Sequence, residues 1–351
     1  MANASKQPRS FNTIRKSQTK ERAKRGRISR IVLLAIVGVA ALLLMVVLLF
    51  GAWSGVAGIV SCAQGCQSCN NLPQNGGGDD FPNANIQYTD ATVQFKDTQI
   101  GDLILVNDVT GDRHKFEYAD DTNALDLVSI QAGIDLIDGV APFSVEAGTT
   151  KMNRVACAAL IKMLNQYYDL TGDNSLGIPT NYAYRSSSTQ AGFSSAVGYA
   201  DHQTGYCVAL ATVNPETKAY SRLTNLEHWV YQNCHKYGFV LRYPAGKDAF
   251  TGVKDYEYCL RYVGVAHATY MKANNLCLEE YITLLQTEHT FGNALSITGV
   301  DGKFYQVYYV PVTTDPNGIT TYQLPSNYEY SLSGDNDGGY IVTVHLSHPK
   351  A

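Results

Sequence analysis

Residues 199–209 read YADHQTGYCVA and residues 255–264 read DYEYCLRYVG. Histidine nitrogen and cysteine sulfur are favoured zinc ligands in proteins. His202 and Cys207 lie in the first segment, and Cys259 lies in the second. On an extended strand, Cys207 and the residue two positions later point to the same face. The interpretation of the chain starts from these two segments.

The first segment resembles the metal-binding strand of the VanY-type D-Ala-D-Ala carboxypeptidases, zinc enzymes that trim peptidoglycan stem peptides. Their pattern is S-x-H-x-x-G-x-A-x-D, in which the His and the Asp bind zinc, and a later E-x-x-H supplies the general base and the third ligand. His202 and Gly205 match this pattern. Ala200, Cys207 and Ala209 stand where the family has Ser, Ala and the ligand Asp. The resemblance thus implies that Ala209 replaces one zinc ligand.

The second segment fixes the other two positions. Its residues 260–264, LRYVG, match those that follow the family's final His. This register puts Cys259 at the third ligand and Tyr256 at the general base. A tyrosine hydroxyl, with an ordinary pKa of about 10, is a poor base at neutral pH. The resemblance therefore implies a degenerate zinc site, with two of the three ligands and the base changed.

Two arrangements of the thiols remain open. His202, Cys207 and Cys259 form a Cys₂His donor set of a kind known at catalytic zinc, although Cys207 is displaced by about 6–7 Å along the strand from Ala209. Alternatively, a Cys207–Cys259 disulfide closes the cleft in an oxidising compartment. We favour a metal-free site, so no cofactor is expected, and zinc is expected only if the site is rewired.

A substitute base is a further alternative. Asp255 and Glu257 flank Tyr256, but in an extended segment both point away from the face that Tyr256 uses. A separate alternative is that Asp201, Asp255 or Glu257 turns into the metal position as a replacement ligand.

Residues 184–190, YRSSSTQ, match the YRS…Q element that precedes the zinc strand in the family. By this resemblance Arg185, Ser186 and Gln190 are the expected substrate contacts. Arg185 either stabilises negative charge that develops in the transition state or binds a carboxylate without catalysis.

The N-terminal region predicts a membrane anchor. Residues 1–30 have a net charge of +9 within a chain of net charge −4. Residues 31–50 contain no charged side chain, which matches the roughly 20 residues of a membrane-spanning helix. We therefore expect a basic cytoplasmic segment (1–30), a transmembrane helix (31–53) and an extracellular C-terminal domain at the plasma membrane. A cleaved signal peptide is the competing interpretation. Membrane proximity explains the basic run without a nucleic-acid partner.

Residues 54–87 read as a juxtamembrane segment and a flexible linker, because they contain Gly76-Gly77-Gly78 and two prolines. Cys62, Cys66 and Cys69 lie in this segment. An odd number of cysteines outside the cell leaves one unpaired, so a disulfide-linked homodimer is one expectation.

The remaining chain divides into a D,D-carboxypeptidase-like domain (88–289) and a C-terminal β appendix (290–351), which resembles that of clostridial members of the family. The implied fold is α+β: a small antiparallel sheet packed on helices, as in the Hedgehog signalling domain, preceded by a single transmembrane helix. The patterns predict strands at 103–106, 304–312 and 339–346 and helices at 152–170 and 224–237. His235 and His267 fall outside the zinc positions, and structural roles are expected for both.

Two function hypotheses follow. The leading one is a membrane-anchored pseudoenzyme at the cell wall that binds a peptidoglycan stem peptide or an envelope protein through the former zinc cleft. The alternative is an active zinc D,D-carboxypeptidase that releases the terminal D-Ala with a rewired metal site. A third possibility is a purely structural envelope protein whose cleft is closed.

Overall fold

The structure, a computed structural model, describes residues 82–94, 98–109, 111–313 and 318–350. All of these lie in the compact unit Gln74–Ala351. The predicted basic segment, the transmembrane helix and Cys62, Cys66 and Cys69 lie outside the described residues. Within the described ranges, no helix is both long enough and apolar enough to cross a bilayer.

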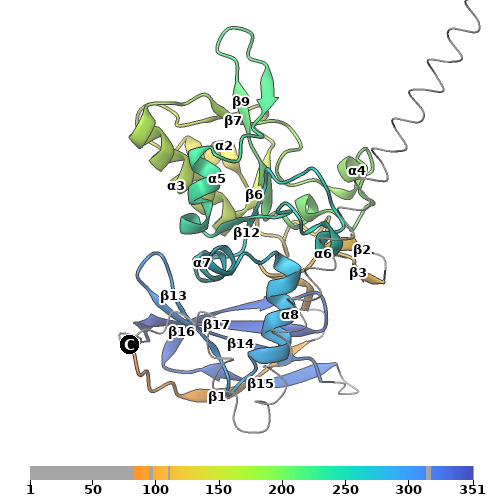
Figure 1. Cartoon of the computed structure of the whole chain (residues 1–351), viewed down its shortest axis with the longest axis vertical. Coiled ribbons are helices and arrows are strands. Elements are labelled where there is room, and N and C mark those ends of the chain that lie inside the picture. The colour runs from red at the N-terminus through yellow and green to blue at the C-terminus, as the bar shows by residue number, and fades with distance from the viewer. Residues whose placement is uncertain (1–81, 95–97, 110, 314–317, 351) are drawn as a thin grey trace, which may run out of the picture. The chain divides into compact units, whose positions relative to one another are not determined.

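The described chain combines helices with several small sheets (Figure 1), which confirms the α+β class. The prediction of one small sheet was too simple, because the strands form separate sheets of two to four strands. The strands before the C-terminal region are β1 (Tyr88–Gln94), β2 (Asn107–Val109), β3 (Asp112–His114), β4 (Leu127–Ser129), β5 (Ser144–Val145), β6 (Lys151–Asn153), β7 (Leu176–Ile178), β8 (Cys207–Ala209), β9 (Ala211–Val213), β10 (Tyr220–Arg222), β11 (Phe239–Leu241) and β12 (Cys259–Tyr262).

The helices include several of only one turn. They are α2 (Ile130–Ile134), α3 (Arg154–Thr171), α4 (Ser187–Gln190), α5 (Trp229–Asn233), α6 (Asp248–Thr251), α7 (Val265–Asn274) and α8 (Leu278–Glu288), with 3₁₀ turns η2 (Asp201–Thr204) and η3 (Cys234–Tyr237). The longest of these, α3, begins where the Asn153 side chain accepts hydrogen bonds from the amides of Val155 and Ala156. It ends at Gly172, which has a φ of 69°. Val155, expected on a buried row, is 56% exposed, so one side of α3 faces solvent.

The sheet β11-β12-β8 positions the candidate site. Its three strands are antiparallel, and Leu260 of β12 lies opposite Val208 of β8. Both side chains belong to the core that also contains the buried face of α3. Because side chains alternate along a strand, Cys259 and its partner Ala209 lie on the other face of the sheet.

Two local predictions were wrong. The helix expected from residue 224 begins only at α5, because the Asn225 side chain accepts a hydrogen bond from the amide of Glu227 and His228 caps the helix instead. The strand expected at 103–106 is extended chain whose Leu105 amide donates to the carbonyl of Asp335. Such a partner, far along the sequence, is invisible to a local pattern.

The C-terminal region forms the four-stranded sheet β13-β14-β17-β16, drawn in blue in Figure 1. Its strands are β13 (Leu295–Thr298), β14 (Phe304–Pro311), β16 (Tyr328–Gly334) and β17 (Gly339–Pro349), and β15 (Ile319–Pro325) pairs with β1. The apolar faces of α7 and α8 pack with β13 and β14 in one buried cluster, which also holds Leu103 and Val240. That shared core links this region to the sheet that carries the candidate site.

Candidate metal centre

His202 is held as a neutral imidazole with a defined tautomer. Its Nδ1 lies 2.9 Å from the carbonyl oxygen of Ala183, and since a carbonyl only accepts, Nδ1 carries the hydrogen. Nε2 is therefore the acceptor, and the Tyr256 hydroxyl, 2.9 Å away, donates to it. Burial, together with the positive charge of Arg185, lowers the pKa of His202 to about 3. Nε2, the nitrogen that could bind a metal, thus accepts a hydrogen bond from Tyr256 instead.

The turn that carries His202 depends on Gly205. This residue has a φ of 79°, in the left-handed region that favours glycine. A Cβ at this position would lie 2.8 Å from the Leu127 side chain. Close packing on β4 therefore sets the path from η2 into β8.

The two thiols lie beside the imidazole. Cys259 Sγ is 3.9 Å from His202 Nε2, and the donor atoms of His202, Cys207 and Cys259 all lie within 4.8 Å of one another. Both cysteines are free and buried, so the alternative of a Cys207–Cys259 disulfide is not what the structure holds. Burial and the neighbouring Cys207 raise the pKa of Cys259 well above its usual value, so this thiol is protonated.

The donor set is compatible with zinc in number and spacing. Zinc bonds of about 2.0–2.3 Å in a tetrahedral site place ligand atoms roughly 3.3–3.8 Å apart, so small movements would bring these three donors into range. A bound zinc requires that Tyr256 leave Nε2 and that both thiols lose their protons. His202, Cys207 and Cys259 would hold the ion.

No carboxylate accompanies these donors. Among the described residues the cluster contains only His and Cys side chains, so Asp255 and Glu257 are not part of it. Asp201 is fixed elsewhere by two arginines. Burial raises the pKa of Tyr256 above its ordinary value, chiefly because the anion would be poorly solvated. The position that the resemblance assigns to the general base therefore holds a hydrogen-bond donor.

Arg185 lies close to this centre. Its backbone amide donates to the carbonyl of His202, and its guanidinium stacks 3.8 Å from the ring centre of Phe193. Nε donates to the carbonyl of Asn181 and Nη1 to Gln190. Among the described residues, none accepts a hydrogen bond from Nη2. Arg185 thus retains a donor for a further anionic group.

Ser186 and Gln190 hold the neighbouring turn. The Ser186 hydroxyl caps α4 by accepting from the Thr189 amide. Gln190 is fully buried, and its Nε2 donates to the carbonyl of Ser195 while its Oε1 accepts from Arg185. In this structure both residues support Arg185 and its loop.

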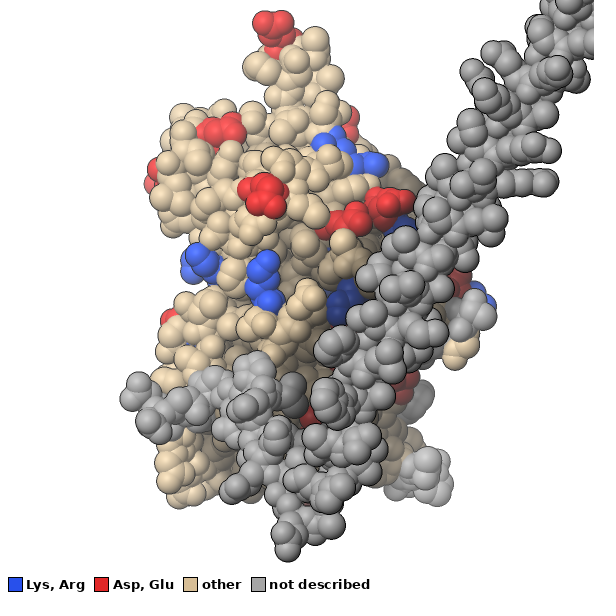
Figure 2. All heavy atoms as spheres, in the orientation of Figure 1, with Lys and Arg blue, Asp and Glu red and all other residues tan. Residues whose placement is uncertain are grey.

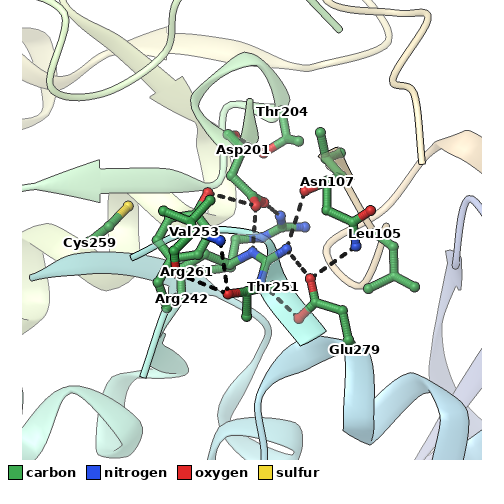
Figure 3. A network of polar contacts seen from close by, with 12 residues as sticks. Leu105, Asn107, Asp201, Thr204, Arg242, Thr251, Val253, Cys259, Arg261 and Glu279 are labelled. Atoms are coloured by element: carbon green, nitrogen blue, oxygen red, sulfur yellow. Dashed lines mark hydrogen bonds and ion pairs between the residues drawn. The ribbon is translucent and has the colours of Figure 1, made fainter. Parts of the chain in front are cut away.

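An ion network beneath the centre was not anticipated from the sequence. Figure 3 shows the guanidinium groups of Arg242 and Arg261 on either side of the Asp201 carboxylate. Arg242 also binds Glu279 through Nη1 at 3.0 Å and Nη2 at 2.7 Å. The side chains of Asp201, Arg242 and Arg261 are completely buried. Their signal was the Leu-Arg-Tyr sequence that occurs at residues 241–243 and again at 260–262, since a buried arginine needs a carboxylate partner.

A cavity of about 270 Å³ is lined in part by the aromatic side chains of Tyr199 and Tyr243. Tyr243, which packs on Cys207 and Cys259, forms part of its lining. Ser194 and Ser195 from the loop after α4, Asn107 and Asp108 from β2, and Thr251 contribute polar groups. The cavity is large enough for a short peptide segment and offers polar contacts on several sides.

Comparison with known proteins identifies a family that this chain resembles. Residues 160–265 match the family described as VanY, D-alanyl-D-alanine carboxypeptidase. A D-alanyl-D-alanine carboxypeptidase of Enterococcus faecium is 29% identical over 266 residues, which cover 72% of this chain and 78% of that protein. The putative carboxypeptidase YodJ of Bacillus subtilis is 36% identical over 86 residues, 24% of this chain and 32% of that protein.

The fold has a solved counterpart. The crystal structure of the vancomycin resistance D,D-dipeptidase VanXYg, in complex with a D-Ala-D-Ala phosphinate analogue, aligns with a TM-score of 0.60 at 20% identity. The alignment covers 74% of this chain and 99% of that one. The match over residues 160–265 spans His202, Ala209, Tyr256 and Cys259, and Cys259 lies directly opposite Ala209 in the sheet. The chain therefore carries a domain of the VanY family of D-alanyl-D-alanine carboxypeptidases.

Proposed function

We propose that this protein is a cell-wall D-Ala-D-Ala carboxypeptidase homologue that binds peptidoglycan stem peptides without cleaving them. The observation that carries the proposal is the hydrogen bond between the Tyr256 hydroxyl and His202 Nε2. Tyr256, which stands at the position of the general base, thereby bonds to the nitrogen that would bind a metal. Ala209, opposite Cys259, offers no ligand atom.

Binding is supported by what surrounds the closed centre. Within the described part of the chain, Arg185 keeps a donor without an acceptor at Nη2, and a guanidinium recognises a peptide carboxylate well because it is planar and permanently charged. The cavity beside Tyr243 provides room for the preceding residues of a peptide. An envelope protein that presents a carboxylate to Arg185 is the alternative partner.

The test is calorimetric titration of the full chain, in mild detergent, with a pentapeptide that ends in D-Ala-D-Ala. We expect saturable binding and no release of D-Ala. Arg185→Gln should weaken binding by about tenfold, because a charge-assisted hydrogen bond is lost. Arg154→Gln is the matched control, since Arg154 is 65% exposed and pairs with Asp126 on the surface of α3. Absence of binding would favour a purely structural envelope protein.

A second candidate is an active zinc D,D-carboxypeptidase. Its support is that the donor atoms of His202, Cys207 and Cys259 all lie within 4.8 Å of one another. Zinc held by His202, Cys207 and Cys259 would supply a Lewis acid and lower the pKa of its bound water to about 7. The chain would still need a base, which the cluster does not contain. Release of D-Ala from the same pentapeptide, lost in Cys259→Ala, would establish this candidate in place of the first.

We further propose that residues 31–53 anchor the protein in the plasma membrane with the N-terminus in the cytoplasm. The support is the uncharged run at 31–50 after a basic segment. The chain should sediment with membranes, and removal of residues 1–53 should release it. A homodimer through Cys62, Cys66 or Cys69 should appear on a non-reducing gel and disappear on reduction.

A further inference from the structure

A second cavity, of about 110 Å³, lies away from the metal centre. It is bounded by η3, by the edge strand β11 and by the C-terminal end of α7, and it shares no lining residue with the cavity beside Tyr243. Its apolar wall comes from Tyr231, Phe239, Leu241, Met271 and Leu276. Its polar residues include His235, Lys272 and Asn275.

His235, one of the residues that line this cavity, has an unsatisfied side-chain atom. Its Nδ1 is buried and has no hydrogen-bond partner, and within the described residues it is the one buried side-chain nitrogen or oxygen in that condition. A buried polar atom without a partner costs about 1–3 kcal/mol, so an atom of this kind indicates that something else binds there. The candidates are a water molecule and a ligand.

The charge around His235 favours an anion. Burial, followed by the positive charges of Lys272 and Lys236, lowers the pKa of His235, so the ring is neutral. Among the described residues, no Asp or Glu forms an ion pair with either lysine. On the face shown in Figure 2, several Lys and Arg side chains lie around the region where α7 is drawn in Figure 1. The Cys234 thiol, whose pKa burial raises to about 12, adds no negative charge.

The volume limits the size of the ligand. An apolar protein cavity of about 150 Å³ binds benzene, which has six carbon atoms. A cavity of 110 Å³ therefore accepts a group of about that size only if part of it remains outside. Lys272 is exposed, which places a cation at the surface beside the cavity.

We propose that this cavity binds a short aliphatic carboxylate, whose alkyl part contacts Phe239, Leu241 and Met271 and whose carboxylate accepts a hydrogen bond from His235 and pairs with Lys272. The carboxylate belongs either to a free short-chain acid or to the C-terminal residue of a peptide with an aliphatic side chain. The site is independent of the peptide binding proposed above for the former zinc cleft.

The test uses the full chain in mild detergent and the imidazole Hε1 NMR signal of His235, assigned by its loss in His235→Gln. Isobutyrate should shift this signal saturably, whereas isobutyramide, of the same shape but uncharged, should bind at least about tenfold more weakly. Lys272→Met should weaken isobutyrate binding by about tenfold. Lys162→Met is the control, because Lys162 is an exposed lysine on α3 outside the cavity.

Comparison with N-acetylvaline distinguishes the two sources of the carboxylate. Tighter binding of N-acetylvaline than of isobutyrate identifies a chain terminus, and isobutyrate binding alone identifies a free acid. Equal effects of isobutyrate and isobutyramide, or no shift with either at about 50 mM, would overturn the proposal and assign a water molecule to His235. An unchanged affinity in Lys272→Met would overturn it as well.

Discussion

At the scale of single residues, the centre differs from a metallopeptidase site by a few side chains whose effects reinforce one another. Tyr256 donates to the nitrogen that a metal would need. Ala209, which offers no ligand atom, lies directly opposite Cys259. The thiols of Cys207 and Cys259 are free and buried, and that of Cys259 is protonated. The bond from Tyr256 and the missing donor at Ala209 both disfavour metal binding, and the tyrosine hydroxyl is a poor proton acceptor at neutral pH.

Replacing Tyr256 with phenylalanine tests the capping role. Tyr256→Phe frees His202 Nε2 and should raise the affinity for zinc by roughly fivefold, the equivalent of one neutral hydrogen bond. The measurement is a competition with a zinc chelator under reducing conditions. Tyr258→Phe is the control, because its ring lies 4.8 Å from that of Tyr256 without bonding to His202. An affinity that is unchanged or lower in Tyr256→Phe would contradict the cap.

The buried ion network predicts a large stability effect. Asp201→Asn removes the carboxylate that pairs with both Arg242 and Arg261, which are fully buried, and leaves Glu279 paired with Arg242. Breaking a buried pair in this way costs about 3–5 kcal/mol. Urea unfolding should therefore show a lower midpoint with the same slope. Asp126→Asn removes the partner of the exposed Arg154 and should cost less than about 1 kcal/mol. Similar costs for both variants would refute the importance of the network.

At the scale of elements, the site is set by how β8 and β12 pair. A slip of β12 by one residue would exchange the two faces of that strand, moving Cys259 into the core and Leu260 into the cleft. The buried pair of Leu260 and Val208 resists such a slip. Arg261 lies on the same face as Cys259, so the ion network and the thiols share one side of the sheet.

The contact between α7 and β17 gives the protein a predictable acid sensitivity. His267 of α7 is buried, with Nδ1 2.8 Å from the Tyr281 hydroxyl and Nε2 3.0 Å from that of Thr343. Burial, and then His345, lowers the pKa of His267 to about 3. The ordinary pKa of about 6.5 applies to the unfolded chain, so between these values only the unfolded state binds the proton. The free energy of unfolding therefore decreases as the pH falls below about 6.5. The contribution of His267 to this decrease is at most about 1.4 kcal/mol per pH unit.

Urea titrations at several pH values between 7 and 4 measure this slope. The variant His267→Asn should have a shallower slope than the unmodified protein below about pH 6.5, and the same slope above it. Parallel curves for the two proteins across the range would show that His267 is not buried as a neutral ring.

At the scale of the whole molecule, local patterns predicted what depends on neighbours in sequence. The strands expected at 304–312 and 339–346 were found as β14 and β17, and the helix expected at 152–170 as α3. The family's motifs placed His202 and Cys259 together. The pairing of β1 with β15, and of Leu105 with Asp335, joins residues more than 200 positions apart. A single sequence does not encode such partners in any local pattern, and the same limit concealed the link between Asp201 and Glu279.

The most direct test of the account is the zinc content of the full chain, purified under reducing conditions and dialysed against trace zinc, with D-Ala release measured on the same sample. We expect far less than one zinc per chain and no release of D-Ala. Zinc binding should be restored by three substitutions combined in one chain. Ala209→Asp supplies a carboxylate ligand, Cys259→His supplies an imidazole ligand, and Tyr256→Glu supplies a base. About one zinc per chain in the unmodified protein, lost in Cys259→Ala and accompanied by D-Ala release, would contradict the account.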